Sequence, residues 1–244
     1  MKKNFFDQIK TASVNIKHKH YTDSEYNRLT GRGAKKLSFA SLNGFFRQIK
    51  KAAHINNNRK FIYAYWDKLD SLCHRKGVKS REVKNHFDEL DKKIESLAKS
   101  LKNDNTAIIV TADHGQIDTE KGKVIELKNH PKFVETLAMP LCDEPRAAYC
   151  YVRPQKVKQF ENYVKTVFKK ICEIHKSSEL IKNNYFGLFE PNKKLQDRVG
   201  DYVLIMKENY IMKDLVFGEE KNIFIGNHGG LSKEEMFVPL IVIK

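Results

Sequence analysis

The chain has 244 residues, of which 41% are hydrophobic, so it is long enough to bury a packed core as a globular protein. Its 45 Lys and Arg outnumber its 30 Asp and Glu and give a formal net charge of +15. This charge favours anionic partners such as phosphates, nucleic acid or acidic lipid, without choosing among them. Because the lysines are scattered singly or in pairs, solvated helix faces are the simpler explanation for most of them.

The sequence also leads to an expectation about the cellular compartment of the protein. No segment approaches the roughly 18 consecutive apolar residues of a membrane-spanning helix, and no apolar stretch of signal-peptide length follows Met1. The four cysteines form neither a C-x-x-C pair nor a dense framework, which indicates a reduced intracellular protein. We therefore expect a cytoplasmic protein with no membrane partner; if the chain is a fragment, its first residue says nothing about targeting.

The first part of the chain predicts an α/β unit. About 35 polar, weakly periodic residues at its start are expected to be irregular or partly helical. Hydrophobic spacing then predicts a helix from Ser41, a strand at Phe61–Tyr65, a loop through Asp67, Asp70, His74 and Gly77, a helix from Val83 to Leu101, and a strand at Thr106–Thr111. Since a helix separates the two strands, we expect them to pair in parallel, with functional groups at their carboxyl ends.

The later residues predict a smaller module, followed by a return to the main sheet. Within 140–219 the pattern predicts a strand at Ala147–Val152, a helix at Pro154–Ile171 with Val157, Phe160, Val164, Val167 and Phe168 inward, and strands near Leu180, Tyr202 and Ile211. A turn containing Glu234 and Glu235 precedes a last strand at Val238–Ile243. We expect an α/β fold, with a mostly parallel central sheet that has helices on both faces. Its core is 1–139 and 220–244, and 140–219 is an α+β cap or insert.

Three short segments combine His or Asp with glycine near a predicted strand end: Asp70-x-x-x-His74 with Gly77, Thr111-Ala-Asp113-His114-Gly115, and Gly226-Asn-His228-Gly-Gly230. Imidazole and carboxylate groups are the ligands that suit zinc and related divalent ions. Asp-x-x-x-His returns both side chains to one side of a helical turn or tight loop, and an adjacent Asp-His pair can reach two different ions. One such segment alone is weak evidence for a metal site, because an isolated histidine more often has a structural, hydrogen-bonded role than a ligand role. In this order and beside these strands, the five side chains predict two neighbouring metal ions.

These segments, together with the closing Val-Pro-Leu strand, resemble the alkaline-phosphatase superfamily, and within it the type I phosphodiesterase and nucleotide pyrophosphatase group. The resemblance runs from about Tyr26 to the end, and Glu144-Pro-Arg-Ala-Ala-Tyr149 supports it. It implies that Asp70, His74 and His228 hold one metal ion, and that Asp113 and His114 are ligands of the second. One departure is Cys73, which stands where the family usually has a small residue; we interpret it as an inert thiol.

The resemblance also implies residues that the sequence does not show. The family uses an earlier Asp and a Thr or Ser nucleophile, on a strand and helix start upstream of Asp-x-x-x-His. Before Phe61, Thr11, Ser13, Thr22 and Thr30 are interpreted as lacking a preceding apolar strand and Asp. We therefore expect the chain to begin after the nucleophile, which leaves the catalytic residue unknown, and to hydrolyse phosphodiesters poorly or not at all by itself.

The function implied is a hydrolase of phosphodiester or phosphomonoester substrates, such as nucleotides. Its cofactors would be two divalent metal ions, with zinc favoured and manganese or magnesium as alternatives. Two other classes stay open: an inactive metal-binding or partner-binding fragment, favoured by the missing nucleophile, and a basic nucleic-acid-binding protein. The last is not favoured, because the basic residues are not interleaved with aromatics in a recognition motif.

Overall fold

The computed structural model describes residues 3–55, 58–214 and 224–244 and divides the chain into two compact units. Unit 1 falls within Met1–Ser71, Lys84–Ile108 and Val242–Lys244, and unit 2 within Leu72–Val83 and Ile109–Ile241. In the described part of the chain, no helix combines the length and apolar character needed to cross a membrane. The predicted 140–219 module falls inside unit 2, with 215–219 outside the described residues, and its status as a separate domain stays a prediction.

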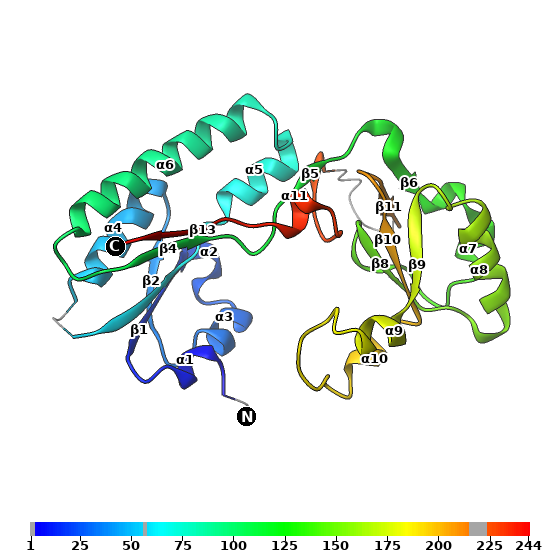
Figure 1. Cartoon of the computed structure of the whole chain (residues 1–244), viewed down its shortest axis with the longest axis horizontal. Helices are drawn as coiled ribbons and strands as arrows, with labels where there is room; N and C mark the ends of the chain where they lie inside the picture. Colours follow the sequence, from blue (N-terminus) through cyan, green and yellow to red (C-terminus); the bar gives the residue numbers. More distant parts are fainter. Residues whose placement is uncertain (1–2, 56–57, 215–223) are drawn as a thin grey trace. The chain divides into compact units, whose positions relative to one another are not determined.

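Unit 1 is built on a three-stranded parallel sheet in the order β2-β1-β3, with α4 and α6 packed against it (Figure 1). Its elements are α1 (Phe5–Gln8), β1 (Ala12–His18), α2 (Lys19–Thr22), α3 (Glu25–Thr30), β2 (Lys35–Phe39), α4 (Leu42–Ala53), β3 (Lys60–Ala64) and most of α6 (Arg81–Leu101). Apolar residues recur every three or four positions on both long helices, so each presents one apolar stripe. Ile16 of β1, Phe46 of α4 and Leu97 of α6 meet in one buried cluster.

Two expectations for this region need correction. The partly helical start is confirmed by α1, α2 and α3, but these residues also contain β1, the central strand of the sheet, whose alternation is hidden because Ser13 and Asn15 are buried polar residues. The segment expected to be a loop through Asp70 and His74 is helix α5 (Lys68–Lys76). Polar residues weaken the periodicity of α5, yet its carboxyl end is fixed by tertiary hydrogen bonds.

Unit 2 contains a four-stranded antiparallel sheet in the order β7-β8-β10-β9, which α8 covers with Phe160 and Val164 (Figure 1). Its elements are β5 (Ile117–Asp118), η1 (Lys121–Lys123), β6 (Val124–Glu126), η2 (Leu127–Asn129), α7 (Pro131–Val134), β7 (Cys142–Glu144), β8 (Ala147–Cys150), η3 (Pro154–Lys156), α8 (Val157–Thr166), β9 (Cys172–Lys176), α9 (Ser177–Lys182), α10 (Leu195–Arg198), β10 (Tyr202–Met206), β11 (Ile211–Lys213), β12 (Gly226–Asn227) and α11 (Lys233–Met236). β11 pairs in parallel with β6, and β12 pairs antiparallel with β5.

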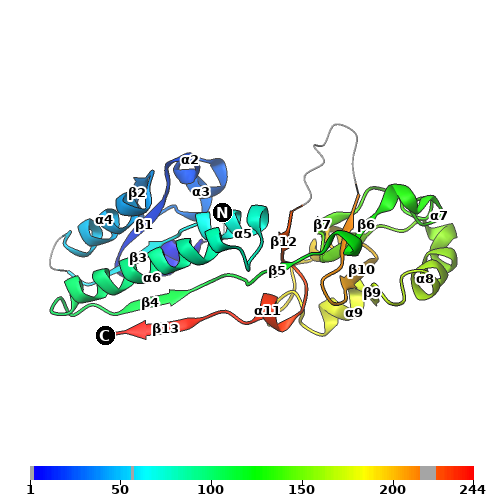
Figure 2. The same ribbon diagram turned by 90° about the horizontal axis from the view of Figure 1, so that it is seen from above.

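The predicted α/β fold with a parallel sheet is confirmed, but three details differ. β3 pairs with β1, whereas β4 (Ile108–Thr111) pairs with β13 (Leu240–Ile243), as Figures 1 and 2 both show, so the expected pairing of the two strands that flank α6 is wrong. Leu180 lies on helix α9 instead of a strand. Val167 is 49% exposed instead of buried, because α8 ends at Thr166 and the chain turns there.

Candidate metal centre

Three of the five predicted ligands are histidines that unit 2 brings together. His74 lies on α5, His114 follows β4, and His228 follows β12 directly. Strand β12 pairs with β5 in a register that sets Asn227 opposite Ile117. The residue before His228 is therefore held beside a residue three positions after His114, which brings the two histidines together across a long stretch of sequence.

The three imidazole rings form a compact group in which His228 is the shared neighbour. Its ring is stacked on that of His114, with centroids 3.8 Å apart and planes 22° from parallel. The ring of His74 lies 5.1 Å from that of His228, at 54°, and the ring of Phe224 lies 4.8 Å from that of His74, at 43°. Aromatic packing thus restricts the orientations that His74 can adopt.

Backbone carbonyls fix the protonation pattern of two of these rings. His74 Nδ1 lies 2.8 Å from the Gly226 carbonyl oxygen, and His114 Nδ1 lies 3.1 Å from that of Gly115. A carbonyl oxygen only accepts, so Nδ1 of each neutral ring carries the proton and Nε2 carries the lone pair. Metal-binding histidines typically have this arrangement, in which the outer hydrogen bond orients the ring.

The two predicted carboxylate ligands stand beside the histidines. Asp113 Oδ1 lies 3.9 Å from His114 Nε2, and its side chain is 62% exposed. Asp70 stands one turn before His74 on the same helix, α5. His114 and His228 each offer one ligand atom, and these two atoms lie within 4.8 Å of each other.

This donor set fits a divalent metal ion. Imidazole nitrogens are common zinc ligands, and the His114 and His228 side chains are half-buried. Two atoms that bind one zinc ion lie at most about 4.4 Å apart, since each bond is about 2.0–2.2 Å long. Small side-chain movements would bring the two histidine atoms into bonding range of one ion. This grouping joins His114 with His228, whereas the predicted sets separate them, and the assignment of ligands to ions stays a prediction.

Glycines allow the backbone around these residues to pack closely. Gly115 N donates to the Glu235 carbonyl oxygen at 2.8 Å, and a Cβ on Gly115 would stand 1.9 Å from the Glu234 carbonyl oxygen. Gly77 has a φ of +85°, and the backbone N–H of the next residue, Val78, donates to Asp118 Oδ1 at 2.6 Å. Both glycines therefore permit a close approach of protein segments that lie next to the ligands.

Sequence reasoning missed a buried ion pair next to the histidines. Arg146 and Glu235 are each 1% exposed and form two hydrogen bonds, Nε to Oε1 at 2.9 Å and Nη2 to Oε2 at 2.7 Å. One signal was present: Ser232 followed by Glu235 is a capping-box pattern, and Ser232 N donates to Glu235 Oε2 at 3.3 Å at the start of α11. The partner of the carboxylate could not be read from the pattern, because 89 residues separate it from Arg146.

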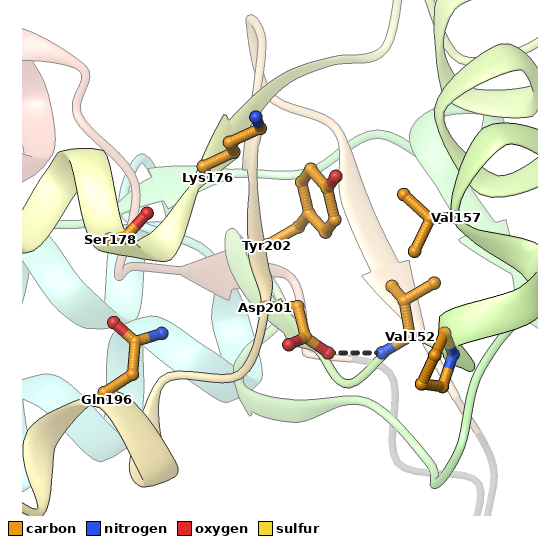
Figure 3. Close-up of a pocket in the computed structure, with 8 residues that line it drawn as sticks. Val152, Val157, Lys176, Ser178, Gln196, Asp201 and Tyr202 are labelled. Atoms are coloured by element: carbon orange, nitrogen blue, oxygen red, sulfur yellow. Dashed lines mark hydrogen bonds between the residues drawn. The ribbon is translucent and has the colours of Figure 1, made fainter.

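A cavity of about 330 Å³ lies elsewhere in unit 2, against β10 and α10 (Figure 3). Lys176, Gln196 and Asp201 line it, and Asp201 Oδ2 accepts a hydrogen bond from Val152 N at 2.8 Å. None of the five predicted ligands lines this cavity. It is therefore separate from the histidine group.

A family model described as type I phosphodiesterase / nucleotide pyrophosphatase matches residues 4–231. No curated protein matches the sequence. Among solved structures, murine ectonucleotide pyrophosphatase / phosphodiesterase 5 is similar to this chain with a TM-score of 0.69 and 20% identity, over 96% of this chain and 60% of its own. Another structure of that protein is an inactive threonine-to-alanine variant in complex with AMP.

Phosphonoacetate hydrolase from Sinorhizobium meliloti 1021, in complex with phosphonoformate, is similar with a TM-score of 0.66 and 15% identity. The likeness covers 96% of this chain and 66% of the hydrolase. At sequence identities of 20% and 15%, the similarity to these two structures establishes a shared fold. This chain spans about 60% of the length of the murine protein.

Proposed function

Because this chain belongs to the type I phosphodiesterase / nucleotide pyrophosphatase family, we propose that it carries the metal-binding part of a two-metal hydrolase of phosphate esters. The observation that supports this most is the stack of His114 on His228, which brings two imidazole ligands within 4.8 Å of each other. Carboxylate and imidazole groups gathered at strand and helix ends are what a divalent ion needs from a protein.

We propose that Asp70, His74 and His228 hold one ion and that Asp113 and His114 contribute to the second. Two bound divalent ions would stabilise the charge that develops on the attacking and leaving oxygens during phosphoryl transfer. The contribution of this chain is to orient the ligands. The Gly226 and Gly115 carbonyls direct Nε2 of His74 and His114, and the β12–β5 ladder holds His228 beside them.

The proposed substrate class is a phosphodiester or phosphomonoester, such as a nucleotide. The murine neighbour binds AMP in one structure, and the bacterial neighbour binds phosphonoformate, so both neighbours take small anions that contain phosphorus. A net charge of +15 attracts anions of this kind. A nucleic-acid partner is compatible with the charge, but the metal ligands favour a small phosphate ester. The cytoplasmic location stays a prediction.

Hydrolysis of phosphate esters by this chain alone would require a nucleophile among its own residues. Strands β1 and β2 precede Phe61, and β1 lies before Thr22 and Thr30, which corrects the expectation that these two hydroxyls lack a preceding strand. Ser41 is a hydroxyl that follows a strand and begins helix α4, but its Oγ accepts a hydrogen bond from Gly44 N at 3.1 Å, so it serves as the helix cap. Without an assigned nucleophile, an inactive metal-binding or partner-binding module remains the second candidate function.

A zinc titration with a competing chelator tests the proposal, and native mass spectrometry counts the bound ions. We expect two zinc ions per chain, at least one of which is lost in His228→Ala. His175→Ala is the matched control, because His175 lies on β9 of the same unit and is paired with Glu173 at 3.3 Å. Absence of zinc binding by the natural chain, or an equal loss in both variants, would contradict the metal centre. AMP binding that requires zinc would favour a nucleotide over a nucleic-acid partner.

A further inference from the structure

We propose that the buried Arg146–Glu235 pair is a positioning device for the histidine group. That the histidines bind metal rests on the proposed function, but all the contacts that support the positioning role lie within unit 2. Glu235 belongs to α11, and Arg146 stands in the turn between β7 and β8. The pair therefore joins the antiparallel sheet to the segment that carries His228.

The Glu235 carboxylate holds the loop after His228. Its Oε1 accepts a hydrogen bond from Gly230 N at 2.8 Å, and its Oε2 accepts one from Ser232 N at 3.3 Å. A Cβ on Gly230 would stand 2.8 Å from Glu235 Oε2 and 2.9 Å from Arg146 Nη2. The loop thus lies directly against the ion pair, two residues after the histidine.

The backbone of the same glutamate holds the segment after His114. The Glu235 carbonyl oxygen accepts a hydrogen bond from Gly115 N at 2.8 Å, and Gly115 immediately follows His114. One residue is therefore bonded to both chain segments whose imidazole rings stack at 3.8 Å. If Glu235 moved, both histidine segments would lose an anchor.

Arg146 holds the glutamate in turn. Its Nε and Nη2 form a two-bond fork with the carboxylate, and its Nη1 donates to the Tyr210 carbonyl oxygen at 2.7 Å. A capping box alone would need only the Ser232–Glu235 contact at the helix start. Burying a charge pair costs desolvation free energy that such a box does not require. The planar two-bond fork of the arginine fixes the orientation of the carboxylate as well as its distance. The arginine thus defines the direction of the carboxylate and, through it, the loop.

The test replaces the pair with apolar residues of similar size, in Arg146→Met/Glu235→Leu. Such replacements of buried pairs are often tolerated by the fold, but this one removes the acceptors for Gly230 and Ser232. We expect the zinc affinity, measured by chelator competition, to fall by about 10- to 100-fold, the usual effect of losing a group that orients metal ligands. Thr136→Val is the control, because Thr136 is buried in unit 2 and its hydroxyl donates to the Phe133 carbonyl oxygen at 2.6 Å, away from the histidines. It should lower the melting temperature and leave zinc affinity unchanged.

A folded double variant with natural zinc affinity would overturn the proposal, as would an equal loss of affinity in Thr136→Val. A measurement on the natural, metal-free chain remains decisive if the double variant does not fold or if the natural chain binds no zinc. The amide hydrogens of Gly115 and Gly230 should exchange with solvent as slowly as those of β10, since the glutamate holds both. Fast exchange at either glycine would refute the positioning role, whereas failure of zinc binding with slow exchange would refute the proposed function alone.

Discussion

The imidazole ring of His114 lies flat against that of His228, with centroids 3.8 Å apart. If the two rings serve different ions, replacing a ligand of one ion should leave the other bound. We predict that His114→Ala and His74→Ala each reduce the zinc count from two to one, as measured by native mass spectrometry. If His114→Ala removes both ions, the two rings share an ion, contrary to the proposed assignment.

Gly115 offers a second test, independent of the ligands. A Cβ there would stand 1.9 Å from the Glu234 carbonyl oxygen, so Gly115→Ala must displace the backbone of α11. We expect urea unfolding to show a loss of about 1–3 kcal/mol, the usual range for overpacking, with weaker zinc binding. Gly122→Ala is the control because nothing lies within 4 Å of its added Cβ; it should leave zinc binding unchanged. Equal effects of the two changes would show that steric contact at Gly115 is unimportant.

Acid should weaken unit 2 through Glu235. Burial by itself would raise the pKa of this carboxyl, but the hydrogen bonds and charge of Arg146, with the donors from Gly230 and Ser232, outweigh burial and lower the pKa below 4.5. Its contribution to stability is therefore complete above about pH 4.5 and is lost as the pH falls through the lower folded value. We predict that the midpoint of urea unfolding decreases less below pH 4.5 in Glu235→Gln than in the natural chain. An identical slope would contradict the pairing.

Much of the fold follows from apolar spacing, and the rest depends on contacts that spacing does not encode. Helix α6 was predictable because Val83, Leu97 and Leu101 form one buried stripe. Strand β1 was not, because its central place comes from neighbours on both sides and not from alternation. The five ligands were found because each carries metal chemistry beside a glycine or a strand end, but their assignment to ions stays a prediction. The role of Arg146 was not predicted, because its partner Glu235 is adjacent to it only in the folded chain.

The cysteines should differ sharply in reactivity. Burial raises the pKa of Cys172 to about 12 and that of Cys150 well above its ordinary value, so both thiols stay protonated at neutral pH. Cys142 is partly exposed, whereas Cys73 is 8% exposed on α5. We predict that a thiol reagent at pH 7 modifies Cys142 first and that peptide mass mapping finds the others only after unfolding. Rapid modification of Cys73 would contradict its interpretation as an inert thiol beside the histidines.

The last prediction concerns turnover by the chain itself. With zinc or manganese and a chromogenic phosphodiester, we expect slow hydrolysis at most, because no described hydroxyl has been assigned as a nucleophile and the Ser41 hydroxyl serves as a helix cap. The proposed second ion has only Asp113 and His114 as assigned ligands, whereas protein zinc sites normally supply three or four, so it should be the more weakly held of the two ions and should bind only at high zinc concentration. A metal-bound water would then be the remaining nucleophile, with no residue assigned to position it. Asp113→Ala should therefore change the slow rate little, and His175→Ala should not change it. Robust, metal-dependent turnover that Asp113→Ala abolishes would show that a nucleophile is present in these residues and that the second ion is fully held.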